Sequence, residues 1–274
     1  MNERAIWNRC AQLVVVLLCV LTLKQYYSTA SPNQLCWILA PTTVLVELVS
    51  RRPFEFESHT GYISGDRTFL IAASCAGVNF LITSFLMLSL RKLWRDRSQN
   101  IPWRFIPAAA LVAYLATLVA NTVRISTALR LQRVSLKISW LSPNQLHRCE
   151  GVFIYFGFLL LLFIVSEKMS SDSAAVLNVS RPNASGLYRQ FLFPLLIYYA
   201  TALAIPLVNG AYQRTDFWEH SLFVLLTPLL LILPLATFRF YRLSRHGNRS
   251  PSSSLKGTIS GYKEKLLATR ISFL

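Results

Sequence analysis

The sequence predicts an all-α, polytopic membrane protein, with a bundle of about six transmembrane helices plus interfacial helices. Of its 274 residues, 53% are hydrophobic and only 15% are charged, and the mean hydropathy is +0.42. Several uncharged apolar runs are long enough to cross a hydrocarbon core about 30 Å thick. Because a soluble domain could not hide so much apolar surface, the membrane is the expected solvent of these runs.

The net charge of +16 predicts contact with anionic lipid headgroups and basic cytoplasmic loops. A nucleic-acid partner is not expected, because no recognition motif accompanies the basic residues. The N-terminal basic and apolar segment resembles a signal peptide. No clear small-residue cleavage site follows it, so a retained first helix is predicted.

The predicted crossings follow the apolar runs in chain order: Cys10–Tyr27, Phe69–Leu90, Phe105–Val123, Gly151–Ser166, Gln190–Val208 and Ser221–Phe238. A further run, Leu35–Val49, is shorter and contains Pro41 and Glu47, so we expect it to lie in the interface or to re-enter. The polar segment Ser50–Thr68 is predicted to contain a short extended piece. Residues 1–238 are assigned to an integral membrane domain, and residues 239–274 to a basic cytoplasmic tail.

Charge asymmetry predicts the orientation of the bundle. Basic residues crowd the N-terminus, the 91–104 loop and the tail, so all three are expected on the cytoplasmic side, with an even number of crossings between the ends. This topology places Cys75 and the 124–150 segment at the outer face. Apolar and basic stripes from Arg130 to Leu141 predict an amphipathic surface helix there, which either anchors to headgroups or gathers an acidic substrate segment or lipid phosphates.

Cys75, Arg124 and His147 are the candidate catalytic residues, because the predicted topology brings them from three different elements to one face. Small neighbours leave room around the Cys75 sulfur. A thiol is nucleophilic only as the thiolate, which a nearby cation, an imidazole or a helix N-terminus favours. His147 can act as base and acid, and Arg124 can donate hydrogen bonds to an oxyanion. The combination is typical of acyl transfer.

Each candidate also has a structural interpretation. A membrane cysteine is usually a small packing residue. An arginine after an apolar run usually anchors the helix at the interface, and a histidine before a span is often only a polar flanking residue. Asn79 could orient the thiol or serve helix packing, and Asn121 could hold the arginine or cap a helix end. Glu150 could orient the imidazole or pair with Arg148.

The five cysteines argue against two other classes of site. None forms a C-x-x-C motif, so neither a zinc ribbon nor a dithiol oxidoreductase is supported, and no metal or cofactor is expected. An odd count leaves at least one free thiol, while an outer-face disulfide at Cys36 or Cys149 stays open.

Three motifs, in this order and near predicted helix ends, resemble those of the exosortase/archaeosortase family. They are Cys75-Ala-Gly within Ser-Cys-Ala-Gly-Val-Asn-Phe, Asn121-x-x-Arg124-Ile, and His147-x-x-x-Gly151-x-Phe. The motif Cys-Ala-Gly-Val-Asn-Phe is most similar to that of the branch called exosortase K. The resemblance covers roughly residues 35–162. Many relatives have Ser where this chain has Ala76, and eight-span relatives are longer on the N-terminal side.

This resemblance implies a membrane cysteine peptidase or transpeptidase, with Cys75 as nucleophile and Arg124 and His147 as its partners. The implied substrates are exported proteins whose C-terminal sorting signal has a short recognition motif, an apolar helix and a basic cluster. The implied location is the bacterial inner (plasma) membrane, with the site facing the periplasm or outside. Substrate identity, the acceptor and the oligomeric state stay open.

Two non-enzymatic interpretations are the alternatives. A transporter-like protein would carry ionisable residues at mid-helix and an internal repeat. The predicted spans are almost free of ionisable residues, and no repeat is apparent. A non-catalytic scaffold is compatible with every feature of the sequence.

Overall fold

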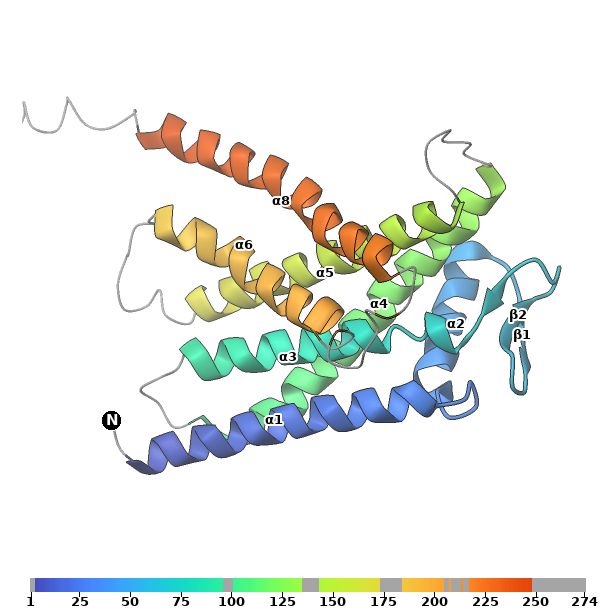
Figure 1. The fold of residues 1–274 in the computed structure, drawn as a ribbon, viewed down its shortest axis with the longest axis horizontal. Coiled ribbons are helices and arrows are strands. Elements are labelled where there is room, and N and C mark those ends of the chain that lie inside the picture. The colour runs from blue at the N-terminus through green and yellow to red at the C-terminus, as the bar shows by residue number, and fades with distance from the viewer. Residues whose placement is uncertain are drawn as a thin grey trace, which may run out of the picture. The chain divides into compact units, whose positions relative to one another are not determined.

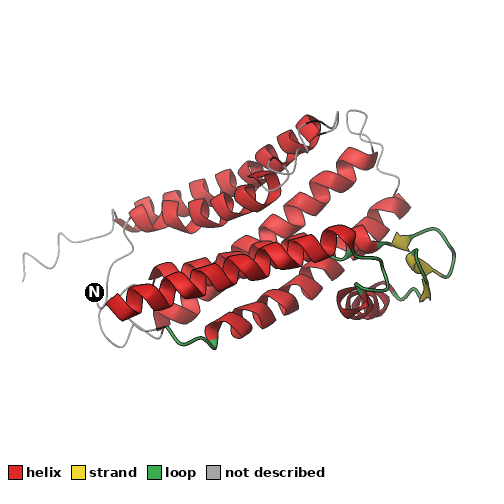
Figure 2. Cartoon of the chain, turned by 60° about the horizontal axis from the view of Figure 1, so that its bottom comes forward, coloured by secondary structure: helices red, strands yellow, loops and turns green. Residues whose placement is uncertain are grey.

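The computed structural model describes residues 3–95, 101–134, 143–172, 184–204, 207, 213 and 217–247, and in these ranges the chain is mostly helical (Figures 1 and 2). The helices are α1 (Glu3–Thr29), α2 (Cys36–Ser50), α3 (Val78–Arg95), α4 (Phe105–Val134), α5 (Pro143–Asp172), α6 (Ala184–Tyr199) and α8 (Phe217–Gly247). A π-helical turn, η2 (Ala200–Ala204), continues α6.

Within the described ranges, five helical segments are long and apolar enough to cross a membrane: Glu3–Thr29, Ala73–Arg95, Phe105–Gln132, Arg148–Met169 and Phe217–Thr237. The predicted class of polytopic helical membrane protein is therefore confirmed. The predicted crossing Gln190–Val208 corresponds to α6 and η2, and its apolar helical part, Phe191–Leu203, is shorter than these five. The expected interfacial run Leu35–Val49 forms α2, which has 15 residues.

The chain divides into two compact units, Met1–Leu229 and Leu230–Leu274. The candidate site lies in the first. In the second, residues 230–247 belong to α8, so the helix continues past the predicted domain boundary at Phe238.

Two helix ends differ from the sequence-based prediction. Helix α4 continues through Arg124 to Val134, so Arg124 lies inside a helix and not at its end. The segment from Arg130 to Val134, expected in a separate surface helix, is part of α4, and residues 135–142 of that expected helix lie outside the described residues. Within the span Ala73–Arg95, Cys75 belongs to a 3-10 turn (Ala73–Cys75), and the α-helix α3 begins at Val78. Apolar runs predict the lipid-exposed part of a helix, and helices extend beyond it.

The polar segment before Cys75 folds into a small antiparallel sheet in the order β1 (Phe54–Glu57), β2 (Gly61–Ser64), β3 (Leu70–Ile71). Tyr62 is opposite Phe56 in one pairing and Ile71 in the other. The predicted extended piece is thus a three-stranded sheet. The predicted span Phe69–Leu90 was therefore wrong at its start, where Leu70 and Ile71 form an edge strand.

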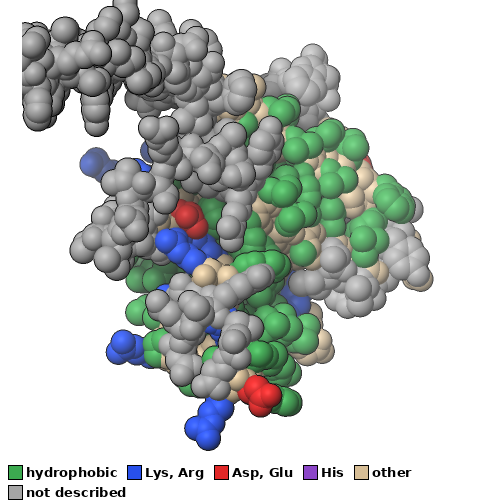
Figure 3. Space-filling model, turned by 90° about the vertical axis from the view of Figure 1, so that its left-hand side faces the viewer, with side chains coloured by type: hydrophobic (Ala, Val, Ile, Leu, Met, Phe, Trp, Pro, Cys, Tyr) green, Lys and Arg blue, Asp and Glu red, His purple; other side chains and the backbone are tan. Residues whose placement is uncertain are grey.

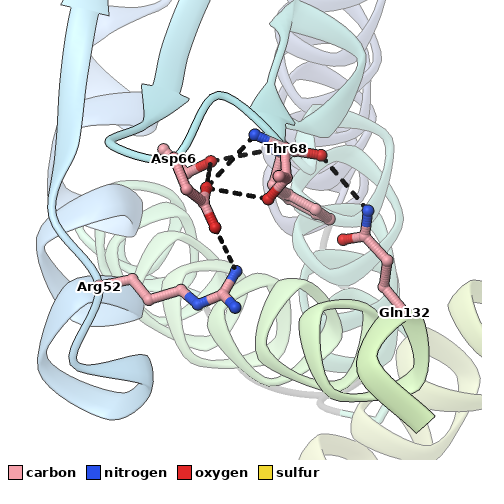
Figure 4. Close-up of polar contacts among 6 residues, drawn as sticks. Arg52, Asp66, Thr68 and Gln132 are labelled. Atoms are coloured by element: carbon pink, nitrogen blue, oxygen red, sulfur yellow. Dashed lines mark hydrogen bonds and ion pairs between the residues drawn. The ribbon is translucent and has the colours of Figure 1, made fainter.

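The loop between β2 and β3 is tied to α4 by polar contacts (Figure 4). The Asp66 carboxylate accepts hydrogen bonds from the hydroxyls of Ser64 (2.6 Å) and Thr68 (2.8 Å) and forms an ion pair with Arg52 (3.5 Å). Those hydroxyls, Ser64 first, lower the pKa of Asp66 to about 2. Gln132 of α4 donates to the Thr68 carbonyl oxygen (3.3 Å). The contacts with Arg52 and Gln132 therefore hold the loop that precedes β3, the strand that leads to Cys75.

At the opposite end of α3, charged residues join α3 to α5. The Arg91 Nε donates to a Glu167 carboxylate oxygen (2.9 Å), and Arg95 lies 3.7 Å from the other oxygen. The Arg91 guanidinium also lies over the Phe163 ring, 5.5 Å from its centroid. Lys and Arg side chains are visible on the face at the left of Figure 1 (Figure 3). This is the end of α3 that the sequence predicts to be cytoplasmic.

Candidate functional site

Cys75 ends a 3-10 turn, η1 (Ala73–Cys75), which lies between the small sheet and α3. Gly77 has φ of +72°, a left-handed conformation that favours glycine and separates this turn from α3. A Cβ at Gly77 would lie 3.2 Å from both the Asn121 Cγ and the Thr117 Cγ2 of α4. Glycine is therefore needed because α4 packs directly against the turn. Cys75 is half-buried.

A chain of hydrogen bonds joins the Cys75 turn to Arg124. The buried Asn121 side chain donates its Nδ2 to the Cys75 carbonyl oxygen (2.6 Å). The Tyr155 hydroxyl of α5 donates to the Asn121 Oδ1 (2.8 Å), and the Arg124 Nη1 donates to that hydroxyl (3.4 Å). The Tyr155 ring stacks on Phe80 of α3, with 5.1 Å between centroids. Three helices thus hold these groups in one network.

The Arg124 guanidinium is confined between α4 and α5. Its Cζ lies 5.4 Å from the centroid of the Tyr155 ring. At Gly151 a Cβ would lie 3.1 Å from the Arg124 Nε, so the glycine lets the α5 backbone lie close to the arginine side chain. Cys75 and Glu150 both lie within electrostatic range of Arg124. A restrained, half-buried guanidinium that acts electrostatically on a thiol can stabilise a thiolate or an oxyanion.

The side chain of His147 lies outside the described residues. Its backbone belongs to the first turns of α5, four residues before Gly151 and eight before Tyr155. Residues four apart lie on the same side of a helix. The position of His147 is therefore on the side of α5 that carries the two contacts with Arg124.

The supporting candidates have different surroundings. Asn121 is linked to Arg124 as expected, but through Tyr155. The carboxylate oxygens of Glu150 are buried, and this residue is one of the groups that act electrostatically on Arg124. Asn79 accepts a hydrogen bond from Lys24 Nζ of α1 (2.8 Å).

Sequence reasoning missed three residues around the Cys75 turn: Tyr155, Lys24 and Tyr27. Lys24 is the one charged residue in the predicted first span, which was an available signal for a function. Tyr155 continues the four-residue spacing from His147 and Gly151. The Tyr27 hydroxyl donates to the Ala73 carbonyl oxygen (3.5 Å), and no feature of the sequence predicted this contact.

A cavity of about 340 Å³ lies beside the turn, and α1, α3, α4, α5, α6, η2 and Val224 of α8 contribute to its wall. Its polar lining includes Lys24, Asn79, Arg124, Arg148 and Tyr155. The volume is within the range of small-ligand pockets, about 300–1,000 Å³.

All five cysteines are free thiols, so the outer-face disulfide left open by the sequence is absent from this structure. Among the described residues, no group of three or more His, Cys, Asp or Glu could hold a metal ion.

No protein-family model matches the chain, and no curated protein or solved structure shows a significant match to it.

Proposed function

We propose that this protein is a membrane-embedded cysteine peptidase or transpeptidase, similar to the exosortase/archaeosortase family and most like exosortase K. It cleaves the C-terminal sorting signal of exported proteins at the outer face of the bacterial plasma membrane. The observation that carries the proposal is the hydrogen-bonded link from the Cys75 turn through Asn121 and Tyr155 to Arg124. This link holds the backbone that carries the thiol and the guanidinium in one network, which supports a joint role for the two side chains.

In the proposed reaction His147 takes the proton of the Cys75 thiol, and the thiolate attacks the scissile carbonyl carbon, whose π electrons move onto oxygen. The Arg124 guanidinium donates hydrogen bonds to this oxyanion. When the intermediate collapses, the C–N bond breaks, and His147 gives a proton to the departing amine. A thioester remains on Cys75. An acceptor amine or water then attacks the thioester and releases the thiol.

The surroundings of Arg124 support its role as an oxyanion donor. Oxyanion stabilisation is effective when the donors are already oriented before the reaction, in a site of low dielectric constant. The Tyr155 ring and hydroxyl and the close α5 backbone at Gly151 restrict the guanidinium. Asn121 restricts the backbone of the nucleophile in the same network. Nucleophile and donor are therefore held relative to each other.

The test is co-expression with an exported reporter that carries a C-terminal motif, an apolar helix and a basic cluster. Wild type should shorten the reporter, and Cys75→Ala should abolish this. The matched control is Cys149→Ala, which removes a half-buried thiol from the first turns of α5 and should leave processing intact. Loss of processing in Arg124→Lys and His147→Ala is also expected. Processing that survives Cys75→Ala would falsify the proposal.

The proposed orientation has a separate test. In a chain whose other four cysteines are replaced by serine, a membrane-impermeant maleimide should label Cys75 from outside intact cells. Labelling only after the inner side is exposed would show that the topology is inverted.

A further inference from the structure

Lys24 is a cation inside the membrane-spanning helix α1. It lies five residues before the last residue of the helix, Thr29, which corresponds to about 7–8 Å along the axis. Its Nζ donates to the Asn79 Oδ1 (2.8 Å) and lies 5.7 Å from the centroid of the Tyr27 ring. Within the part of the chain that the structure describes, no carboxylate pairs with it. A membrane-embedded ammonium without an acidic partner is costly and marks a functional position.

Two further cations share the cavity that Lys24 lines. Arg124 and Arg148 belong to the same wall, and among the described residues of the lining there is no Asp or Glu. The nearby Glu150 carboxylate acts on Arg124 from outside the lining. The described lining of the cavity is therefore cationic, and Lys24 contributes an ammonium for which the described residues supply no carboxylate. An anionic group is the ligand that these charges favour.

The depth of the cavity indicates the source of the anion. Lys24 is near the last turn of α1, Asn79 is the second residue of α3, and Arg148 begins the apolar run of α5. Membrane helices reach the headgroup region at their ends, so a basic pocket between helices at this depth can contact the phosphate of a phospholipid. From Lys24 the cavity extends over α3 to Thr201 of η2, so it lies between spanning helices. These positions favour a lipid phosphate over an acidic peptide from the aqueous side.

We propose that this cavity binds the phosphate of an anionic phospholipid headgroup, with Lys24 and Arg148 as its cationic ligands beside Arg124. Lys24 has three N–H donors, and one of them goes to Asn79, so two remain for phosphate oxygens. The Cys75 thiol is not one of the ligands, so the binding is measured separately from the proposed peptidase reaction, with which it shares the cavity wall at Arg124.

The test measures lipid binding to the purified full-length protein in neutral detergent by native mass spectrometry. The probes are phosphatidylglycerol, phosphatidylcholine, inorganic phosphate and an acidic peptide. We expect wild type to bind phosphatidylglycerol in preference to phosphatidylcholine. Lys24→Gln should weaken that binding about fivefold, corresponding to ~1 kcal/mol for one basic residue near the membrane surface. Lys24→Arg should preserve it.

The controls separate this site from general charge effects and from the peptidase. Lys92→Gln removes an exposed cation at the other end of α3 and should leave the binding unchanged. Cys75→Ala should also bind phosphatidylglycerol like wild type, whatever its effect on processing. Equal loss in the Lys24→Gln and Lys92→Gln variants would overturn the proposal. So would wild-type binding by Lys24→Gln, or Lys24-dependent binding of inorganic phosphate or the acidic peptide without the lipid.

Discussion

Replacing Gly77 by alanine should destabilise the Cys75 turn by about 2–5 kcal/mol. A left-handed conformation costs a residue with a Cβ about 1–2 kcal/mol, and Gly77 has φ of +72°. The new methyl group would also lie 3.2 Å from side-chain atoms of Asn121 and Thr117, both fully buried on α4. Because neither neighbour can move into open space, overpacking adds about 1–3 kcal/mol. Relief requires the turn to move away from α4.

The free energy of unfolding, measured by denaturant titration in detergent, tests this magnitude, and maleimide labelling of Cys75 tests the movement. In the Gly77→Ala variant the labelling rate should change, because the hydrogen bond from Asn121 to the Cys75 carbonyl holds the turn in place. Gly65→Ala is the matched control, since its Cβ would meet the nearest atom, Pro53 Cγ, at an ordinary 3.5 Å. A Gly77→Ala variant as stable as Gly65→Ala, with unchanged labelling, would refute the reasoning.

Two other predictions concern the network and the sheet. Tyr155→Phe removes the hydroxyl that joins Asn121 to Arg124 and takes the donor from the buried Asn121 Oδ1, so unfolding should become about 1–3 kcal/mol easier and reporter processing should fall. Unchanged values in both assays would contradict the network. The pKa of Asp66 is lowered from 3.8 in the unfolded chain to about 2 in the folded chain. The ionised carboxylate therefore stabilises the 54–71 segment fully at pH values above 3.8, and this stabilisation is lost as the pH falls through about 2. Acid-protease cleavage of this segment should therefore accelerate over that range in wild type, whereas Asp66→Asn should lack this pH dependence; identical pH profiles would contradict it.

Hydropathy predicted the helical membrane class and the approximate position of most helices. Each apolar run has to satisfy its backbone hydrogen bonds internally, so a long uncharged run has one structural solution in lipid. The same signal misplaced helix ends. It stopped α4 before Arg124 and extended α3 back over an edge strand, because helix ends depend on packing and backbone conformation as well as on apolar content.

The candidate site was predictable in its residue types and not in its connections. Cys75 and Arg124 are chemically distinctive in an apolar chain, so the sequence alone singled them out and gave them a consistent chemistry. Tyr155 and Lys24 were passed over, although both are in the same cavity wall. Their importance depends on partners that are 34 and 55 residues away in the chain, Asn121 and Asn79 respectively. No local pattern reports such contacts.

What the sequence determined by itself is therefore the class of the fold, the membrane as its solvent and the short list of candidate side chains. These follow from composition and local spacing, which act through solvation and helix periodicity. Only the tertiary structure decided that Asn121 holds the Cys75 backbone, that Gly77 and Gly151 lie against α4 and Arg124, and that Lys24 lines a cationic cavity. Those properties arise from close approach between helices that are distant in sequence, and only three-dimensional packing specifies it.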